Sequence, residues 1–371
     1  MSGLTKKIAE EIVKETSLRL NRNVNIMNME GIIIAAHDER RVGSIHEGAV
    51  EVLKKRSPLT INPIDEEVWV GAQPGVNLPI VFNNEILGVI GITGDPEEMG
   101  NIGDLVKMTT ELMIRQEFLV SQMEWKQRTK EMILEQLIKS TPSLEDIHRG
   151  LNLLDLQLLP PFTTIVLQIK EQPILNRELI QKLETCIGNN QAIVGFINVN
   201  RVFIALSGHE EETALHKVKS IYHLMKRLNI VFRMSYSLTF QELEKFSQSY
   251  LDCDITLKIS DPDNDLLSFA QIEVKALFYQ IDDVITKRFS QRVLKNIDHN
   301  KAKTLNSFFK NNLNLQQTAN DLYIHRNTLI YRMNNIVKET GYDPKKFEDA
   351  LILQVAMWIY NRPTKSTLEN N

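Results

Sequence analysis

The first hundred residues alternate between helix-like and strand-like hydrophobic patterns. Apolar side chains recur at helical spacing in residues 5–20, with Lys and Glu between them, which predicts an amphipathic helix. The segment VNIMNMEGIIIAA gives two β-prone runs around Met29 to Gly31, and NLPIVFNNEILGVIGITG gives two more around Asn83 to Glu85. Each pair predicts a β-hairpin, because a short polar or glycine-containing turn joins its two runs. Residues 1 to about 97 are therefore expected to form a small α+β module.

A second helix is predicted between the two hairpins. In SIHEGAVEVLKKR, Ser44 is followed three residues later by Glu47, which is the spacing of a capping box. We therefore expect a helix from Ser44 to about Lys55. Its first turn would offer unpaired N–H groups and the positive end of the helix dipole to an anion.

A long helix is predicted over residues 105–137. Its positions at alternating spacings of four and three are Leu105, Thr109, Leu112, Gln116, Leu119, Met123, Lys126, Lys130, Ile133 and Leu137, and six of these ten are strongly apolar. Such a stripe fits a dimeric coiled coil, in which a second copy covers it. It equally fits a helix that packs on its own domain. The pattern leaves both interpretations open.

After Pro160 and Pro161 the pattern changes to strands that alternate with helices. Strands are predicted from FTTIVLQIK, from AIVGFINVNRVFIALSG as a pair joined at Asn198 to Asn200, and from VFRMSYSLTF. Helices are predicted from ELIQKLETCI and from Glu210 to Leu228. We expect a second α+β domain here, with SDPDND, Ser260 to Asp265, as its exit loop.

Three helical segments are predicted near the C-terminus: Leu305 to Asn311, Leu315 to Leu322, and His325 to Thr340 before Gly341. Ala319 is small enough to let the second and third segments cross closely. Apolar side chains at compatible spacing would face the core, namely Leu322, Ile324, Leu329, Met333 and Ile336. This is the pattern of a helix-turn-helix.

Positive charge is concentrated in this C-terminal region. The formal net charge of the chain is -4, yet residues 300–340 carry six Lys and Arg against two acidic residues, a local charge of +4 that leaves -8 elsewhere. Positive charge attracts phosphate, and Arg and Asn can contact guanine and adenine edges bidentately. The predicted DNA-binding residues are Arg326, Asn327, Thr328, Tyr331, Arg332 and Asn335. The alternative is a solvated amphipathic helix whose charges merely face water.

Specific motifs resemble a family of transcription factors. The run TANDLYIHRNTLIYRMNNIVKETG, with His325 to Leu329 followed by Tyr331 and Arg332, looks like the C-terminal helix-turn-helix of the PucR and CdaR (carbohydrate diacid regulator) proteins. The segments DERRVGSIHEGAVEVL and QPGVNLPIVFNNEILGVIGITGDPEEM are similar to the sugar diacid recognition domain of the CdaR branch. One departure is Tyr323, where many helix-turn-helix motifs carry Gly, and it predicts a less tight turn.

The resemblance covers nearly the whole chain and implies a multidomain fold. It implies a PAS/Cache-like α+β sensor with the long helix in residues 1–135, a GGDEF-like α+β domain in residues 140–265, and an all-α helix-turn-helix domain in residues 300–362. It also implies a cytoplasmic regulator, usually an activator, of genes for uptake or catabolism of sugar diacids or glycerate. The expected partners are double-stranded operator DNA, a small carboxylate effector (glucarate, galactarate or glycerate) and a second copy of the chain.

A small carboxylate is bound by guanidinium or backbone N–H donors. The predicted effector-binding residues lie before or at the start of the 44–55 helix and at the entry to the second hairpin: Arg41, Gly43, Ser44, His46, Gly75, Asn77 and Leu78. The alternatives are a surface arginine at Arg41, a partly buried helix residue at His46 and a turn residue at Asn77.

Several other classes of protein find no support in the sequence. Cys186 and Cys253 form no CxxC pair and have no neighbouring His at ligand spacing, so we expect neither a metal nor a cofactor. No secretion signal or membrane span is expected. The hairpin turn INVNR lacks the Gly-Gly-Asp/Glu-Glu-Phe motif of a cyclase. The competing interpretation is a degenerate or active nucleotide or sugar-acid enzyme in the middle domain, with the C-terminal helices used only for assembly.

Overall fold

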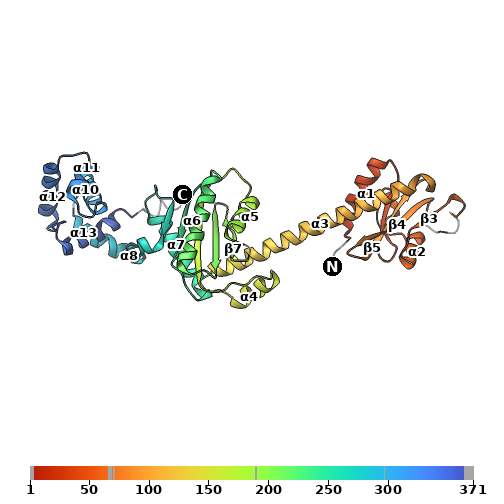
Figure 1. The fold of residues 1–371 in the computed structure, drawn as a ribbon, viewed down its shortest axis with the longest axis horizontal. Coiled ribbons are helices and arrows are strands. Elements are labelled where there is room, and N and C mark those ends of the chain that lie inside the picture. The colour runs from red at the N-terminus through yellow and green to blue at the C-terminus, as the bar shows by residue number, and fades with distance from the viewer. Residues whose placement is uncertain (1–3, 66–68, 70–71, 189, 296, 363–371) are drawn as a thin grey trace. The chain divides into compact units, whose positions relative to one another are not determined.

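In the computed structural model the chain divides into two compact units, Met1–Gln127 and Arg128–Asn371 (Figure 1). The structure describes residues 4–362 except 66–68, 70–71, 189 and 296. Within this described part, no helix is both long enough and apolar enough to cross a membrane.

The first unit is built on a five-stranded antiparallel sheet with the order β2-β1-β5-β4-β3. Its strands are β1 (Val24–Met27), β2 (Ile33–Ala36), β3 (Leu59–Ile61), β4 (Gly75–Phe82) and β5 (Glu85–Thr93). The two predicted hairpins are confirmed as β1–β2 and β4–β5. Asn83 and Asn84 make the second turn with φ values of 49° and 67°, a left-handed conformation that Asn tolerates well.

Helices cover both faces of this sheet. On one face, α1 (Lys6–Leu20) and the first part of α3 (Pro96–Ile138) pack Ile12 and Ile114 against strand residues such as Ile90. On the other face, α2 (Glu47–Lys55) packs Ala49 and Val52 against Met27, Ile33 and Val89. Because both faces are covered, a polar side chain on either face is removed from water. The predicted α+β sensor fold is confirmed.

The predicted start of α2 at Ser44 is wrong. The cap is His46, whose ring Nδ1 accepts a hydrogen bond from the Ala49 N–H at 3.2 Å. Ser44 lies before the helix, where its carbonyl accepts from Ile33 N–H while Gly43 N–H donates to the Ile33 carbonyl. These bonds tie the segment before α2 to β2. Two short 3-10 helices, Glu39–Arg41 and Pro63–Asp65, complete the unit.

Helix α3 packs on its own domains at both ends, and the coiled-coil interpretation of its stripe stays a prediction. In its first part Val106 and Ile114 are buried against the sheet, and near its end Ile133 and Leu137 are buried in the core of the middle domain. On another face of residues 105–123, large apolar side chains are about half exposed: Leu105 57%, Met108 50%, Leu112 53%, Leu119 50% and Met123 52%. The helix therefore packs on its own domains and also presents a partly exposed apolar stripe.

The second unit begins with a mixed five-stranded sheet with the order β10-β9-β6-β8-β7. Its elements are α4 (Leu144–Leu153), β6 (Phe162–Glu171), α5 (Asn176–Ile187), β7 (Ala192–Asn198), β8 (Arg201–Ser207), α6 (Glu211–Arg227), β9 (Val231–Tyr236), a 3-10 turn (Leu243–Lys245), α7 (Phe246–Ile259) and β10 (Leu266–Ser268). Helices α5 and α6 cover one face, and α4, α7 and the end of α3 cover the other. The predicted strands and helices are confirmed.

The sheet continues past Ser260–Asp265, the predicted exit loop of the domain. After that turn, β10 returns to the sheet and pairs in parallel with β9, with Leu267 opposite Ser235. A three-residue edge strand carries too short a pattern to be recognised in the sequence.

The C-terminal part of this unit is entirely helical. It contains α8 (Phe269–Gln280), α9 (Asp283–Leu294), α10 (His299–Lys310), α11 (Leu315–Asp321), α12 (Arg326–Thr340) and α13 (Phe347–Tyr360). Ala319 is buried between α11 and α12, and Gly341 ends α12 with φ 83°, as predicted. Helices α9 to α13 share one core around Leu329, Met333 and Ile336.

The prediction of a looser turn at Tyr323 is not supported. Tyr323 itself adopts the left-handed conformation, with φ 54°, that Gly usually supplies. The turn is closed by Tyr323 N–H to the Asn320 carbonyl at 3.1 Å and by Ile324 N–H to the Ala319 carbonyl at 3.0 Å.

Candidate effector site and nucleic-acid interface

A row of polar residues crosses the face of the first sheet that α2 covers. Asn25 in β1 and Asn77 in β4 are both paired with Gly91 in β5, so the three residues share one face. Asn25 and Asn77 are each only 3% exposed. A Cβ atom at Gly91 would lie 2.8 Å from Asn77 Oδ1, so the Asn77 amide lies directly over this glycine. Two buried amides therefore stand on either side of a residue that has no side chain.

The side-chain oxygen of Asn77 is buried and has no hydrogen-bond partner among the described residues. Leaving a buried acceptor unpaired costs about 1–3 kcal/mol, and folded proteins contain few such groups. This unpaired amide oxygen is therefore a position where a ligand hydroxyl or N–H can supply the missing donor.

Arg41 brings a positive charge to the same face. The Asn25 amide is oriented so that both of its polar atoms are hydrogen-bonded. The Asn25 side-chain oxygen accepts from Arg41 Nη1 at 3.1 Å, and the Asn25 side-chain nitrogen donates to the Val24 carbonyl at 3.2 Å. Burial and the nearby Arg41 charge together lower the pKa of His46 to about 4. His46 is thus neutral near pH 7, consistent with its ring accepting a hydrogen bond from α2. The cluster of Arg41, Asn25, Asn77 and His46, which we call the effector cluster, combines one guanidinium with neutral polar groups and a helix N-terminus.

The other predicted effector residues have different positions. Ser44 is exposed, and its hydroxyl donates to the Arg41 carbonyl at 2.6 Å, which supports the segment that carries Arg41. Gly43 is exposed and has φ 89°. Gly75 allows close approach of two strands, because a Cβ there would lie 2.0 Å from the Ile92 carbonyl oxygen. Leu78 packs on the opposite face, in the core with α1 and α3, so its side chain is not brought together with Asn77.

Asn25 belongs to this cluster but was not predicted. The sequence did carry a signal for it, because Asn is depleted in strands and here interrupts the apolar run VNIM. Asn25 is buried because helices cover both faces of the sheet.

The second candidate site is the outer face of α12. Arg326, Asn327, Thr328 and Tyr331 are exposed, whereas the buried face of the same helix carries Leu329, Met333 and Ile336 at 0–1% exposure. For these residues, the predicted DNA-contacting side chains are exposed and the predicted core side chains are buried, as expected. His325 caps the helix through its Nδ1, which accepts from Asn327 N–H at 3.3 Å.

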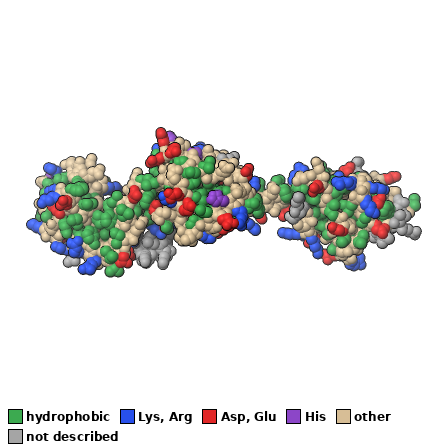
Figure 2. All heavy atoms as spheres, turned by 90° about the horizontal axis from the view of Figure 1, so that it is seen from below, with side chains coloured by type: hydrophobic (Ala, Val, Ile, Leu, Met, Phe, Trp, Pro, Cys, Tyr) green, Lys and Arg blue, Asp and Glu red, His purple; other side chains and the backbone are tan. Residues whose placement is uncertain are grey.

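Arg332 and Asn335 lie at the margin of that face. Both are half-buried, and Arg332 Nη1 donates to Thr304 Oγ1 in α10 at 3.4 Å. Arg332 therefore also links the recognition helix to its neighbour. Figure 2 shows Lys and Arg side chains around a hydrophobic area on the visible face of the C-terminal helices.

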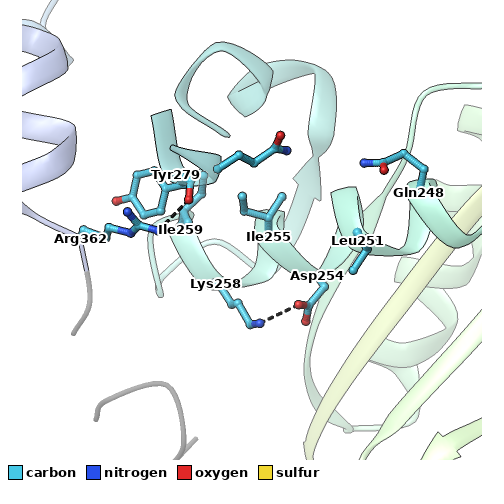
Figure 3. A pocket seen from close by; sticks show the side chains of 9 residues that line it. Gln248, Leu251, Asp254, Ile255, Lys258, Ile259, Tyr279 and Arg362 are labelled. Carbon is cyan, nitrogen blue, oxygen red and sulfur yellow. Dashed lines mark hydrogen bonds and ion pairs between the residues drawn. The ribbon is translucent and has the colours of Figure 1, made fainter. Parts of the chain in front are cut away.

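A cavity of about 450 Å³ lies in the second unit, lined by α7, the end of α8 and Arg362 (Figure 3). Its cations already have anionic partners: Lys258 pairs with Asp254 at 2.7 Å, and Arg362 pairs with Asp283 at 2.5 Å. Arg362 also donates to the Tyr279 carbonyl at 2.6 Å. Both cations are therefore engaged within the protein and do not offer a free charge to a ligand.

The turn of the β7–β8 hairpin is held by a partly buried ion pair. Arg201, directly after the turn, donates to Asp254 at 2.7 Å and to Gln168 at 2.9 Å. The hairpin is thus fixed to α7 and β6 by a polar network. No group of three or more His, Cys, Asp or Glu side chains in the described ranges is arranged to hold a metal ion.

Three protein families match successive parts of the chain. They are sugar diacid recognition over residues 4–137, a GGDEF-like domain over residues 139–259, and the PucR C-terminal helix-turn-helix domain over residues 302–359. Together they follow the elements described above: the first sheet with most of α3, the second sheet with its helices, and the helical C-terminal part.

Relatives match over nearly the full length. The chain is 27% identical over 375 residues to "Carbohydrate diacid regulator" of Escherichia coli (strain K12), covering 95% of this chain and 97% of that protein. It is 26% identical over 371 residues to the uncharacterized protein YsfB of Bacillus subtilis (strain 168), covering 96% and 98%.

A crystal structure of a regulator of polyketide synthase expression from Bifidobacterium adolescentis is 17% identical, with a TM-score of 0.33 over 63% of this chain and 97% of that one. That structural likeness is low. The match to three domain families in one order, together with the full-length relatives, shows the class of regulator. The chain is a CdaR-like transcriptional regulator with a sugar diacid recognition domain, a GGDEF-like domain and a PucR-type C-terminal helix-turn-helix.

Proposed function

We propose that this regulator binds a small hydroxy acid at the effector cluster and thereby controls, as an activator, genes for uptake or catabolism of sugar diacids or glycerate. The observation that carries the proposal is the buried Asn77 side-chain oxygen, which has no hydrogen-bond partner among the described residues. It lies on a sheet face that also bears Arg41. The sugar diacid recognition match and the name of the E. coli relative support the same class of ligand.

The residues of the cluster suit the groups of such a ligand. A guanidinium binds a carboxylate through paired N–H donors, so Arg41 suits the acid group of the ligand. A hydroxyl can donate to Asn77 Oδ1 and so remove the cost of the unpaired acceptor. The N-terminus of α2 adds the positive end of the helix dipole. His46 is neutral and adds no charge to the site. Glucarate, galactarate and glycerate all carry the required groups.

We further propose that the protein works as a homodimer in the cytoplasm, where operator DNA is found. The exposed stripe of α3 (Leu105, Met108, Leu112, Leu119 and Met123) is the surface that a second copy would cover. A dimer would place two recognition helices on double-stranded DNA, which is the usual way to reach specific affinity.

For the middle domain we propose coupling rather than catalysis. Its hairpin turn carries Asn198, Val199 and Asn200, without the acidic pair of a cyclase. The residue after the turn, Arg201, is engaged with Asp254 and Gln168 and so serves packing. This favours a regulator over the enzyme interpretation.

A thermal unfolding assay of the full chain tests the ligand proposal. Glucarate, galactarate and glycerate are each added at millimolar concentration, and a ligand at 100 times its Kd should stabilise the folded state by about 2.7 kcal/mol. Arg41→Ala should abolish the shift, with DNA affinity largely kept. Arg19→Ala, which removes an exposed arginine of α1 on the opposite side of the sheet, is the matched control and should keep most of the shift. If none of the three acids shifts the wild-type transition, the ligand class is wrong.

A further inference from the structure

Tyr323 is the residue in the turn between α11 and α12, and its backbone is strained. Its φ of 54° lies in the left-handed region, which is unfavourable for an L-residue with a Cβ and almost neutral for glycine. Elsewhere the chain mostly fills such positions with Asn, the side chain that tolerates them best: Asn21, Asn83, Asn84, Asn190, Asn229 and Asn312. An aromatic side chain is an unfavourable choice here.

The Tyr323 side chain does not offset this strain by packing. It is 95% exposed, so the ring buries almost no apolar area against the rest of the chain. The two hydrogen bonds that close the turn come from backbone groups, which any residue would provide. A side chain that costs folding energy and gains no internal contact points to a contact outside the chain.

Its position indicates what that contact is. Tyr323 lies three residues before Arg326, at the N-terminal end of the exposed reading face of α12. In a helix-turn-helix that end of the recognition helix enters the major groove, and the preceding helix crosses the phosphate backbone. Tyr hydroxyls are among the groups that donate to phosphate oxygens and fix the register of a protein on DNA.

We propose that Tyr323 is a DNA-contact residue that donates its hydroxyl to a backbone phosphate beside the bases that Arg326 and Asn327 face. This rests on the DNA-reading role of α12. Because the phenol is neutral, the contact releases no counterion and should leave the salt dependence of binding unchanged. Because phosphates carry no sequence information, it should strengthen binding to specific and unrelated DNA alike.

Two substitutions in the full chain test the proposal. Tyr323→Phe removes only the hydroxyl, and Tyr323→Gly removes the side chain together with the strain. Tyr360→Phe, at an exposed tyrosine at the end of α13, is the matched control. Affinity is measured by fluorescence anisotropy at several salt concentrations on a promoter fragment and on a random-sequence duplex, and stability is measured by thermal unfolding.

We expect Tyr323→Phe to weaken binding to both duplexes roughly tenfold or more, with an unchanged salt slope and Tm, since a hydrogen bond to a charged acceptor is being lost. Tyr323→Gly should weaken binding at least as much while raising Tm, an opposite pair of effects that a structural role cannot produce. Tyr360→Phe should match the wild type.

Wild-type affinity in Tyr323→Phe and Tyr323→Gly would overturn the proposal. Unchanged DNA binding with reduced promoter activity would overturn it too and would assign Tyr323 to a protein contact. A failure of the reading role itself is distinguishable, because Arg326→Ala would then also bind DNA like the wild type.

Discussion

Asn77 Oδ1 lies over Gly91, close enough that a Cβ there would be 2.8 Å away, and within the described residues this oxygen accepts no hydrogen bond. The arrangement leaves a polar atom unpaired between a sheet and a helix. In a purely structural core an apolar side chain at this position would be more favourable. We therefore propose that Asn77 is retained for its ligand.

Replacing Asn77 with Leu should leave the ligand-free protein as stable as the wild type, or more stable by about 1 kcal/mol, because a side chain of similar size removes an unsatisfied buried group. The same variant should lose the ligand-induced shift in Tm. Thermal unfolding with and without the effector measures both effects. Strong destabilisation of the ligand-free Asn77→Leu protein would show instead that Asn77 is needed for folding.

His46 should make the stability of the protein depend on pH. Its folded-state pKa of about 4 lies below the ordinary value of 6.5, so the unfolded chain binds more protons between these values. The contribution of neutral His46 is complete above pH 6.5 and is lost as pH falls towards 4, by up to about 1.4 kcal/mol per pH unit.

Urea unfolding at a series of pH values measures this slope. His46→Asn keeps a side chain that caps helices well but cannot titrate, so the difference in stability between the two proteins should shrink or reverse below pH 6.5. A constant difference across that range would contradict the assignment.

Substitutions on the two faces of α12 should have separate effects. Arg326→Ala, on the exposed face, should weaken DNA binding by roughly 1–3 kcal/mol with little change in Tm. Leu329→Ala, at a fully buried position, should destabilise the helical domain by roughly 2–5 kcal/mol. Gel-shift titration and thermal unfolding distinguish the two outcomes. Loss of folding in Arg326→Ala would assign that side chain to packing.

The α3 stripe predicts that dimerisation can be removed without unfolding. Leu112→Lys places a charge at a position that is already 53% exposed, so the monomer should fold normally while the dimer dissociates. Sedimentation equilibrium measures the change in mass. Ser121→Lys, exposed on the same helix but outside the stripe, should behave like the wild type. A monomeric wild-type protein, or a Leu112→Lys dimer as tight as the wild type, would exclude this surface.

Local hydrophobic patterns were sufficient to predict most of the fold. The two hairpins, the recognition helix and its C-terminal Gly341 follow from apolar spacing and turn residues, which act over a few positions. The opposite environments of Leu329 and Arg326 follow from the same helical period. These features depend little on distant parts of the chain.

Features that depend on long-range pairing were missed. Ser44 and His46 are both compatible with capping a helix, and the pairing of residues 43–46 with β2 decides between them. Asn77 and Leu78 are neighbours in sequence, but their side chains lie on opposite faces of the sheet. Only Asn77 lies on the face that α2 covers. Asn25 and β10 likewise acquire their roles only from strands that are distant in sequence.

The most direct test of the account is the affinity of the full chain for a promoter fragment next to sugar-acid or glycerate genes, measured by fluorescence anisotropy with and without each acid. We predict that at least one of glucarate, galactarate and glycerate changes the Kd for wild-type protein, and that Asn77→Leu and Arg41→Ala bind the fragment but no longer respond. An equal Kd with and without all three acids, or a response that survives both substitutions, would contradict the proposed link between the effector cluster and the DNA-reading helix.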